Sequence, residues 1–366
     1  MHRPARPCWM GETQEPGEMF EERNSAGAFL LSFSQASGVC DREGCVMIEV
    51  SISVEGQTGL TWPLWKRYVA MAEAMGFSGL YRSDHFTMPD PPDEDSLECM
   101  VSLAYLADHS SRVLFGPLVA PLSFRDPVML ARQAAALDDL GEGRMVLGVG
   151  TGWIEREHSL FGYELEDLQT RFARLEEGLE VITRLLRSDE PVSYEGQFYT
   201  LREATLLPRP QRGGGPRILI GGSGTSRTPD LAARYADVWN GIFMDPDTFR
   251  ERSAALDVLL SNHGRQPHEV KRTVAALCFF GDTEEALTRR VQRVREWDEE
   301  LASLSLREAL ETLRTEWGAI AGSPEDVIEQ IQAYEQAGVE ELMLEWFDLD
   351  DIESAEVLAR DVLSRL

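Results

Sequence analysis

The chain has 366 residues, more than one small domain needs, and 43% of them are hydrophobic, so it can bury a large core. Its 63 acidic residues outnumber its 35 basic ones and give a formal net charge of −28. Nucleic acid and anionic membrane surfaces would repel such a protein, and we exclude both as partners. No apolar run approaches the roughly 18 residues that a membrane helix needs.

The first 46 residues differ in composition from the rest of the chain. They are rich in Pro, Gly, Ser and Glu and show no sustained hydrophobic period. We interpret residues 1–46 as a disordered extension or a mis-assigned start, and residues 47–366 as one domain. A cleaved export signal is the less favoured alternative, because Glu21 and Glu22 precede the short apolar run at 28–33 where such a signal carries Lys or Arg.

The cysteines do not suggest a disulfide framework or a zinc site. They are odd in number and lack paired CxxC spacing, so we predict no metal and a reducing, cytoplasmic location. The five cysteines are Cys8, Cys40, Cys45, Cys99 and Cys278.

From Met47 onward, short apolar strands alternate with amphipathic helices. In the first half we predict strands at 48–54, 79–82, 113–119 and 145–150, and helices at 62–75, 96–109, 127–140 and 168–186. Gly76 ends the first of these helices, and Pro127 begins the third, where its missing N–H costs nothing.

A polar insertion at 194–207, with two possible strands, and a Pro/Gly-rich stretch at 208–216 open the second half. Further strands are predicted at 218–220, 238–243, 270–280 and 342–344, and helices at 228–235, 249–262, 284–317, 324–337 and 352–366. The helical stretch 284–317 is long enough for two helices with a break. Eight strands, each followed by a helix, predict a closed parallel (β/α)₈ TIM barrel with insertions. An open doubly wound sheet is less favoured, because the first strand lacks a GxGxxG turn.

In such barrels the chemistry lies where strands end, which directs attention to the tetrapeptide Ser-Asp-His-Phe at 83–86. The ordinary pKa of histidine lies near neutrality, so His85 suits proton transfer. Asp84 could orient it or bind a donor on a cofactor. From this tetrapeptide alone, a helix-capping turn with a packed histidine is slightly favoured.

The fourth strand ends in the glycine-rich segment 148–153. Its glycines would allow a planar ligand or a phosphate to approach the backbone around Thr151 and Gly152, and Trp153 could stack on a ring. A glycine-rich strand end with a core Trp explains the segment equally well. Three polar residues follow this segment: Glu155, Glu157 and His158. Each could reach the same end of the barrel, although a solvated helix start is favoured for each.

The sharpest local signal is a Gly/Ser/Thr turn between the fifth strand and its helix. Backbone N–H groups at such a turn and at a helix N-terminus bind anions, so we favour a phosphate site over a simple cap. Arg227 could assist as a charged donor. The residues of this turn are Gly221, Gly222, Ser223, Gly224 and Thr225.

Together these segments resemble the luciferase-like monooxygenase superfamily, particularly its F420-dependent (deazaflavin) oxidoreductase branch. Each motif is weak alone, and their order and spacing carry the resemblance across residues 47–366. The matching segments are 83–86, 123–127, 148–153, 220–224, 232–237, 321–327 and 337–342.

The resemblance implies a role for each segment. Asp84 and His85 would face the cofactor ring, with His85 as a proton donor or relay. Gly152 and Trp153 would line the ring pocket, next to Thr151. The glycine turn at 221–225 would hold the cofactor phosphate.

The family also often carries a non-proline cis peptide at the end of the third strand, as a bulge behind the ring. In this chain that bond would join Leu118 and Val119, which the resemblance therefore places against the cofactor. One position departs from the family. Its sugar-phosphate dehydrogenases have a catalytic glutamate after the Gly-Thr-Gly turn, and here that residue is Trp153, which argues against such a substrate.

Three functions stay open at this point. The leading hypothesis is hydride transfer between coenzyme F420 and a small organic substrate, and the second is an FMN-dependent monooxygenase that uses oxygen and a separate flavin reductase. The third is a non-catalytic cofactor-binding protein. The family often forms homodimers, so a homodimer and a flavin or F420 reductase acting in trans are the partners that the resemblance suggests.

Overall fold

The computed structural model describes residues 47–296 and 298–366. Its centre is a parallel sheet whose neighbouring strands follow the order β3-β2-β1-β12-β10-β9-β8-β5-β4. The strands of this sheet are β1 (Glu49–Val54), β2 (Gly79–Arg82), β3 (Leu114–Pro117), β4 (Ala120–Pro121), β5 (Val146–Gly150), β8 (Arg217–Gly221), β9 (Val238–Ile242), β10 (Lys271–Phe280) and β12 (Glu341–Trp346). Because β3 and β4 are two halves of one interrupted strand, these nine segments make eight barrel strands.

The sheet closes on itself between β3, β4 and β5. Ala120 and Pro121 of β4 pair with the end of β5. At the other end of the seam, Phe115 of β3 forms a parallel bridge with Met145, just before β5 begins. The predicted (β/α)₈ barrel is confirmed.

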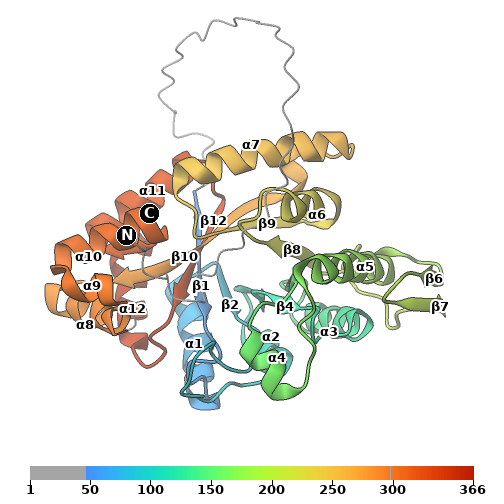
Figure 1. The fold of residues 1–366 in the computed structure, drawn as a ribbon, viewed down its shortest axis with the longest axis horizontal. Helices are drawn as coiled ribbons and strands as arrows, with labels where there is room; N and C mark the ends of the chain where they lie inside the picture. The colour runs from blue at the N-terminus through green and yellow to red at the C-terminus, as the bar shows by residue number, and fades with distance from the viewer. Residues whose placement is uncertain (1–46, 297) are drawn as a thin grey trace, which may run out of the picture.

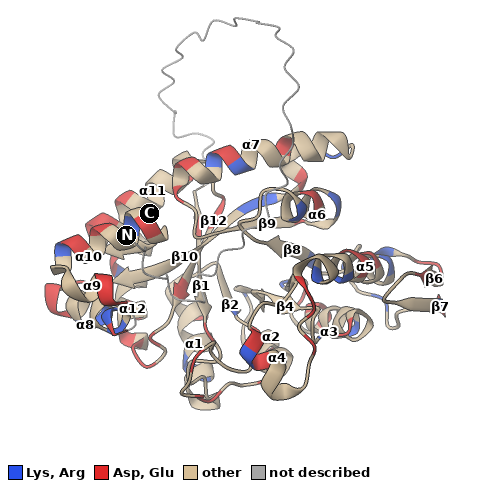
Figure 2. Ribbon diagram, in the orientation of Figure 1, with Lys and Arg blue, Asp and Glu red and all other residues tan. Residues whose placement is uncertain are grey.

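Helices surround the barrel, as Figure 1 shows. They are α1 (Trp62–Met75), α2 (Cys99–His109), α3 (Pro127–Leu140), α4 (Glu155–Phe161), α5 (Leu168–Arg187), α6 (Arg227–Tyr235), α7 (Pro246–Asn262), α8 (Glu284–Arg295), α9 (Glu299–Ser303), α10 (Leu306–Trp317), α11 (Pro324–Gln336) and α12 (Ile352–Asp361). Acidic residues are distributed along many of the outer helices (Figure 2).

The buried side chains form three clusters, and two of them follow from the alternation of side chains along each strand. Residues facing outward, such as Leu342 and Leu344 of β12, pack against the helices in the large core. Residues facing inward fill the barrel in a smaller cluster that includes Tyr81, Leu219 and Met343. The barrel interior is therefore packed, and an active site has to lie at one of its ends.

One region differs from the sequence prediction. The stretch 284–317 forms three helices, α8, α9 and α10, followed by a short strand β11 (Ile320–Gly322) that pairs with the end of β10. The two possible strands of the polar insertion are confirmed as the hairpin of β6 (Val192–Glu195) and β7 (Thr200–Ala204), which lies beside α5 at the edge of the molecule (Figure 1). The helix start considered at Glu155 is the short helix α4.

The prediction for residues 1–46 lies outside the described residues. Within the described part of the chain, no helix is long and apolar enough to cross a bilayer. The described residues also contain no group of three or more His, Cys, Asp or Glu side chains placed to hold a metal ion.

Candidate active site

The imidazole of His85 lies at the carboxyl end of β2, held by a carboxylate from α4. Its Nδ1 is 3.0 Å from Oε1 of Glu157, and the other oxygen of Glu157 accepts the backbone N–H of Phe86 at 3.0 Å. Glu157 is fully buried, so the ring orientation is fixed by a carboxylate with no access to water. With Nδ1 occupied, Nε2 is the nitrogen left to exchange a proton.

The electrostatic surroundings favour the charged form of His85. Burial by itself opposes protonation, but the hydrogen bond and charge of Glu157 outweigh it, with smaller contributions from Glu55 and Asp84, so the pKa of His85 is raised. A histidine with a raised pKa between carboxylates can hold a proton near neutrality and release it to an acceptor.

Trp153 stands directly beside this histidine. The two rings meet edge to face, with centroids 5.9 Å apart and an interplanar angle of 84°. The indole is 40% exposed, so it forms an open wall of the site rather than part of the core. The two residues predicted to be catalytic are therefore neighbours in space, although they lie 68 positions apart in the sequence.

Gly152 directs the chain so that Trp153 lies at the carboxyl end of the barrel strands. Its φ of +77° is in the left-handed region, and a Cβ there would lie 2.1 Å from Oγ of Ser123. That hydroxyl is within 2.8 Å of Nε2 of His158, a buried histidine of α4. Thr151 is half-buried, and its hydroxyl donates to the carbonyl of Gly152.

Asp84 is buried next to His85 and makes a bidentate ion pair with Arg125. Both of its carboxylate oxygens accept from that guanidinium, at 2.7 and 2.8 Å. Arg125 also donates to Glu98 at 2.7 Å. The carboxylate is thus engaged within the protein and anchors the loop after β2, and a direct contact of Asp84 with a cofactor stays a prediction.

The bond between Leu118 and Val119 is a cis peptide, as the resemblance led us to expect. It separates β3 from β4 and lies on the inner face of the barrel, where both side chains pack against the inner cluster. The N–H of Leu118 donates to the carbonyl of Arg82 at 2.8 Å, which ties the bulge to the end of β2 and so to the segment that carries His85.

The glycine turn follows β8 as predicted. Gly221 ends the strand, and the N–H of Gly222 donates to the carbonyl of Asn240 on β9 at 3.0 Å. Ser223 and Gly224 are partly exposed, Thr225 is exposed, and α6 begins two residues later at Arg227. The guanidinium of Arg227 lies over the ring of Phe172, 5.4 Å from its centroid.

Two residues that the sequence analysis considered were interpreted wrongly. A solvated helix start was favoured for Glu155, Glu157 and His158, and it holds only for Glu155, which is exposed. Glu157 and His158 are buried because α4 turns this face toward the loop after β2. The partner of Glu157, His85, lies 72 positions away in the sequence, so no local pattern could have paired the two.

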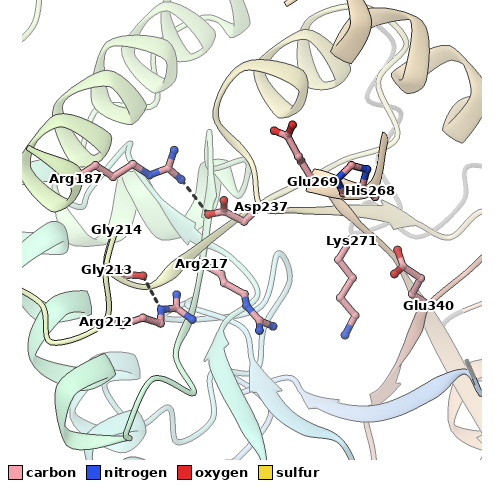
Figure 3. A pocket seen from close by; sticks show the side chains of 11 residues that line it. Arg187, Arg212, Gly213, Gly214, Arg217, Asp237, His268, Glu269, Lys271 and Glu340 are labelled. Atoms are coloured by element: carbon pink, nitrogen blue, oxygen red, sulfur yellow. Dashed lines mark hydrogen bonds and ion pairs between the residues drawn. The ribbon is translucent and has the colours of Figure 1, made fainter. Parts of the chain in front are cut away.

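A hollow lies at the opposite end of the barrel, where β8, β9 and β10 begin (Figure 3). It has a volume of about 540 Å³. Arg187 and Asp237 form an ion pair of 3.0 Å at its edge, and Lys271 is paired with Glu341. Catalytic groups of TIM barrels gather at the other end, so we do not place the reaction here.

The fold and this site describe a parallel-barrel oxidoreductase, and comparison with known proteins agrees. The profile of the luciferase-like monooxygenase family matches residues 45–341, and the chain belongs to that family. It is a luciferase-like oxidoreductase of the F420- or FMN-dependent kind.

Similar proteins include members of both kinds. An F420-dependent glucose-6-phosphate dehydrogenase of Kineococcus radiotolerans is 29% identical over 294 residues, 75% of this chain and 85% of the relative. An FMNH₂-dependent dimethylsulfone monooxygenase of Pseudomonas putida is 28% identical over 221 residues, 60% of this chain and 59% of the relative. An F420-dependent secondary alcohol dehydrogenase, solved with an F420-acetone adduct, shares the fold with a TM-score of 0.71 at 18% identity, covering 86% of this chain and 99% of its own.

Proposed function

We propose that this protein transfers a hydride between coenzyme F420 and a small organic substrate. The observation that carries the proposal is the His85–Glu157 pair beside Trp153, at the barrel end that also holds the glycine turn. The F420-dependent dehydrogenases among the similar proteins support the choice of deazaflavin.

The residues present fit a phosphorylated cofactor. The turn at 221–225 offers backbone N–H groups ahead of α6, and its glycines leave room for a close approach. Beside it, Oδ1 of Asn240 is buried without a hydrogen-bond partner in the described structure, as expected for a group whose partner is a ligand. When bound, the deazaflavin would supply the hydride chemistry.

The protein itself would position the substrate and handle the proton. Glu157 fixes the ring of His85, which would act as a proton donor or relay at the site. Trp153 would cover the substrate and limit access of water. Leu118 and Val119 would support the cofactor ring from the barrel side.

The substrate proposed for this site carries no phosphate. Trp153 replaces the glutamate of the sugar-phosphate dehydrogenases, and two arginines of these loops, Arg125 and Arg156, are already in ion pairs. Arg125 is held by Asp84 and Glu98, and Arg156 by Asp93. A phosphate group would therefore have to displace carboxylates that the protein places there.

The test is a fluorescence titration of the purified protein with F420 and, in parallel, with FMN. We expect saturable binding of F420 at a concentration where FMN does not bind. The variant His85→Ala should then keep F420 binding and lose turnover by about 10²–10⁴-fold, because it lacks the proton-transfer group. Full turnover of His85→Ala would refute the relay role.

An FMN-dependent monooxygenase is the second candidate, favoured by the FMNH₂-dependent relatives. Preferential FMN binding and oxygen uptake during turnover would establish it. A non-catalytic protein is not retained, because the family assignment makes the chain an oxidoreductase. A homodimer, a reductase in trans and a cytoplasmic location stay predictions.

A further inference from the structure

Glu345 points into the barrel at the end of the last strand. In β12, Leu342, Leu344 and Trp346 pack in the outer core, whereas Met343 packs in the inner cluster. Side chains alternate along a strand, so Glu345 lies on the same inner face as Met343, one step nearer the carboxyl end where the site is.

Glu55 reaches the same region from the neighbouring strand. β1 pairs with β12 so that Ser53 is opposite Glu345, and Glu55 follows two residues later on the same face. Its Oε2 accepts from the amide of Gln57 at 2.6 Å, and the oxygen of that amide accepts from the hydroxyl of Ser83 at 2.6 Å. The carboxylate is thereby held in place.

Within the described residues, no hydrogen bond or ion pair engages the carboxyl group of Glu345. On the side away from β1, the register places Leu277 of β10 next to it. Burial, and to a lesser degree the charge of Glu55, raise the pKa of Glu345 well above its usual range.

These groups lie at the same end of the barrel as His85. β2, β1 and β12 are consecutive in the barrel, so their carboxyl ends present His85, Glu55 and Glu345 in turn. The charge of Glu55 contributes to the raised pKa of His85 and to that of Glu345. This end of the barrel therefore combines a proton-holding imidazole, a hydrogen-bonded carboxylate and a carboxyl group without a hydrogen-bond or ion-pair partner among the described residues.

We propose that Glu345 is a second catalytic acid of this site, one that donates its proton to a substrate oxygen and is poised by Glu55. This inference rests on the proposed function. In carbonyl reduction the carbon receives the hydride from the reduced cofactor, and an O–H bond forms at the carbonyl oxygen as the O–H bond of Glu345 breaks. The remaining carboxylate regains its proton from water.

The test of the proton uses infrared spectroscopy on the protein without cofactor. At about pH 7 the wild type should show the C=O band of a protonated carboxyl group, which Glu345→Gln removes. Glu356→Gln, at an exposed position on α12, is the matched control and should keep the band. Glu55→Gln should keep it too but shift its titration to lower pH. A wild type without the band, or a band that survives in Glu345→Gln, would overturn the proposal.

The test of the role uses kinetics. Gln is isosteric with a protonated Glu, so Glu345→Gln should fold and bind cofactor with an unchanged Kd, while kcat falls by about a hundredfold. An unchanged kcat would refute the acid role even if the band is present. Failure of the proposed function can be told apart from failure of this inference. A protein that binds FMN and not F420 would refute the cofactor assignment. The infrared result would still decide whether Glu345 holds the proton.

Discussion

At the scale of single residues, the site depends on which carboxylates are paired and which are not. The negative charge of Asp84 is paired with the guanidinium of Arg125, so it acts only weakly on the ring of His85. Oε1 of Glu157 lies 3.0 Å from Nδ1 of His85 and 3.9 Å from Nδ1 of His158, so its charge acts most directly on the ring of His85. The difference explains how two acids close to one histidine can have different effects on it.

Glu157→Gln tests this account of His85. Removing the negative charge takes away the main influence that raises the pKa of His85, while the amide can still accept the N–H of Phe86. We expect a lower pKa for His85, measured by NMR titration of its ring protons. Glu155→Gln, at an exposed position on the same helix, should leave the pKa unchanged. Equal effects of the two variants would contradict the assignment.

The raised pKa of Glu345 makes the stability of the folded protein depend on pH. Its pKa is higher in the folded protein than the value of about 4.3 in an unfolded chain. Its contribution to the free energy of unfolding is therefore fully present below that unfolded value and is lost as pH rises through the folded-state pKa. Glu345→Gln does not titrate and should lose less stability between about pH 5 and about pH 9, measured by urea denaturation. A pH dependence identical to the wild type would show that Glu345 is ionised in the folded state.

At the scale of elements, the backbones of β3 and β5 approach each other closely at the seam of the barrel. A Cβ on Gly116 would lie 1.7 Å from the backbone carbonyl oxygen of Val146, which cannot move without distorting β5. The seam also carries the Leu118–Val119 bulge, so its geometry affects the site directly.

Gly116→Ala should therefore destabilise the protein. Overpacking of this kind costs about 1–3 kcal/mol, and more where a backbone atom is in the way. Urea denaturation would measure the loss. The control is Gly213→Ala, in a loop where an added Cβ has no neighbour within 4 Å. Unaltered stability of Gly116→Ala would mean that the seam is looser than the structure shows.

The elements also show where prediction from sequence succeeds. Runs such as 270–280 and amphipathic helices such as 168–186 carry their own period, and both were placed within a residue or two. β11 has three residues and is a strand only because it pairs with β10, a contact that no local pattern contains. The break of 284–317 into three helices likewise depends on packing over that extra strand.

At the scale of the whole molecule, the described residues contain a complete barrel. Every strand of the ring and the three clusters of buried side chains lie after Met47, and the family profile begins at residue 45. A chain beginning at Met47 should therefore fold independently.

We expect this shortened chain to melt within about 2 °C of the full-length protein and to bind the same cofactor. Differential scanning calorimetry and the fluorescence titration would check both. A Tm lowered by about 10 °C or more would show that residues 1–46 contribute to the packing of the barrel.

The sequence by itself determined the order of strands and helices, the closed parallel barrel and the segments that reach its mouth. It could do so because hydrophobic period, glycine turns and caps are local properties of the chain. Only the tertiary structure decided that Glu157 holds His85, that Arg125 neutralises Asp84 and that Glu345 lies on the inner face of the barrel. Each of these contacts joins residues on different strands or loops, and their distances depend on barrel closure and strand register, which no local pattern specifies.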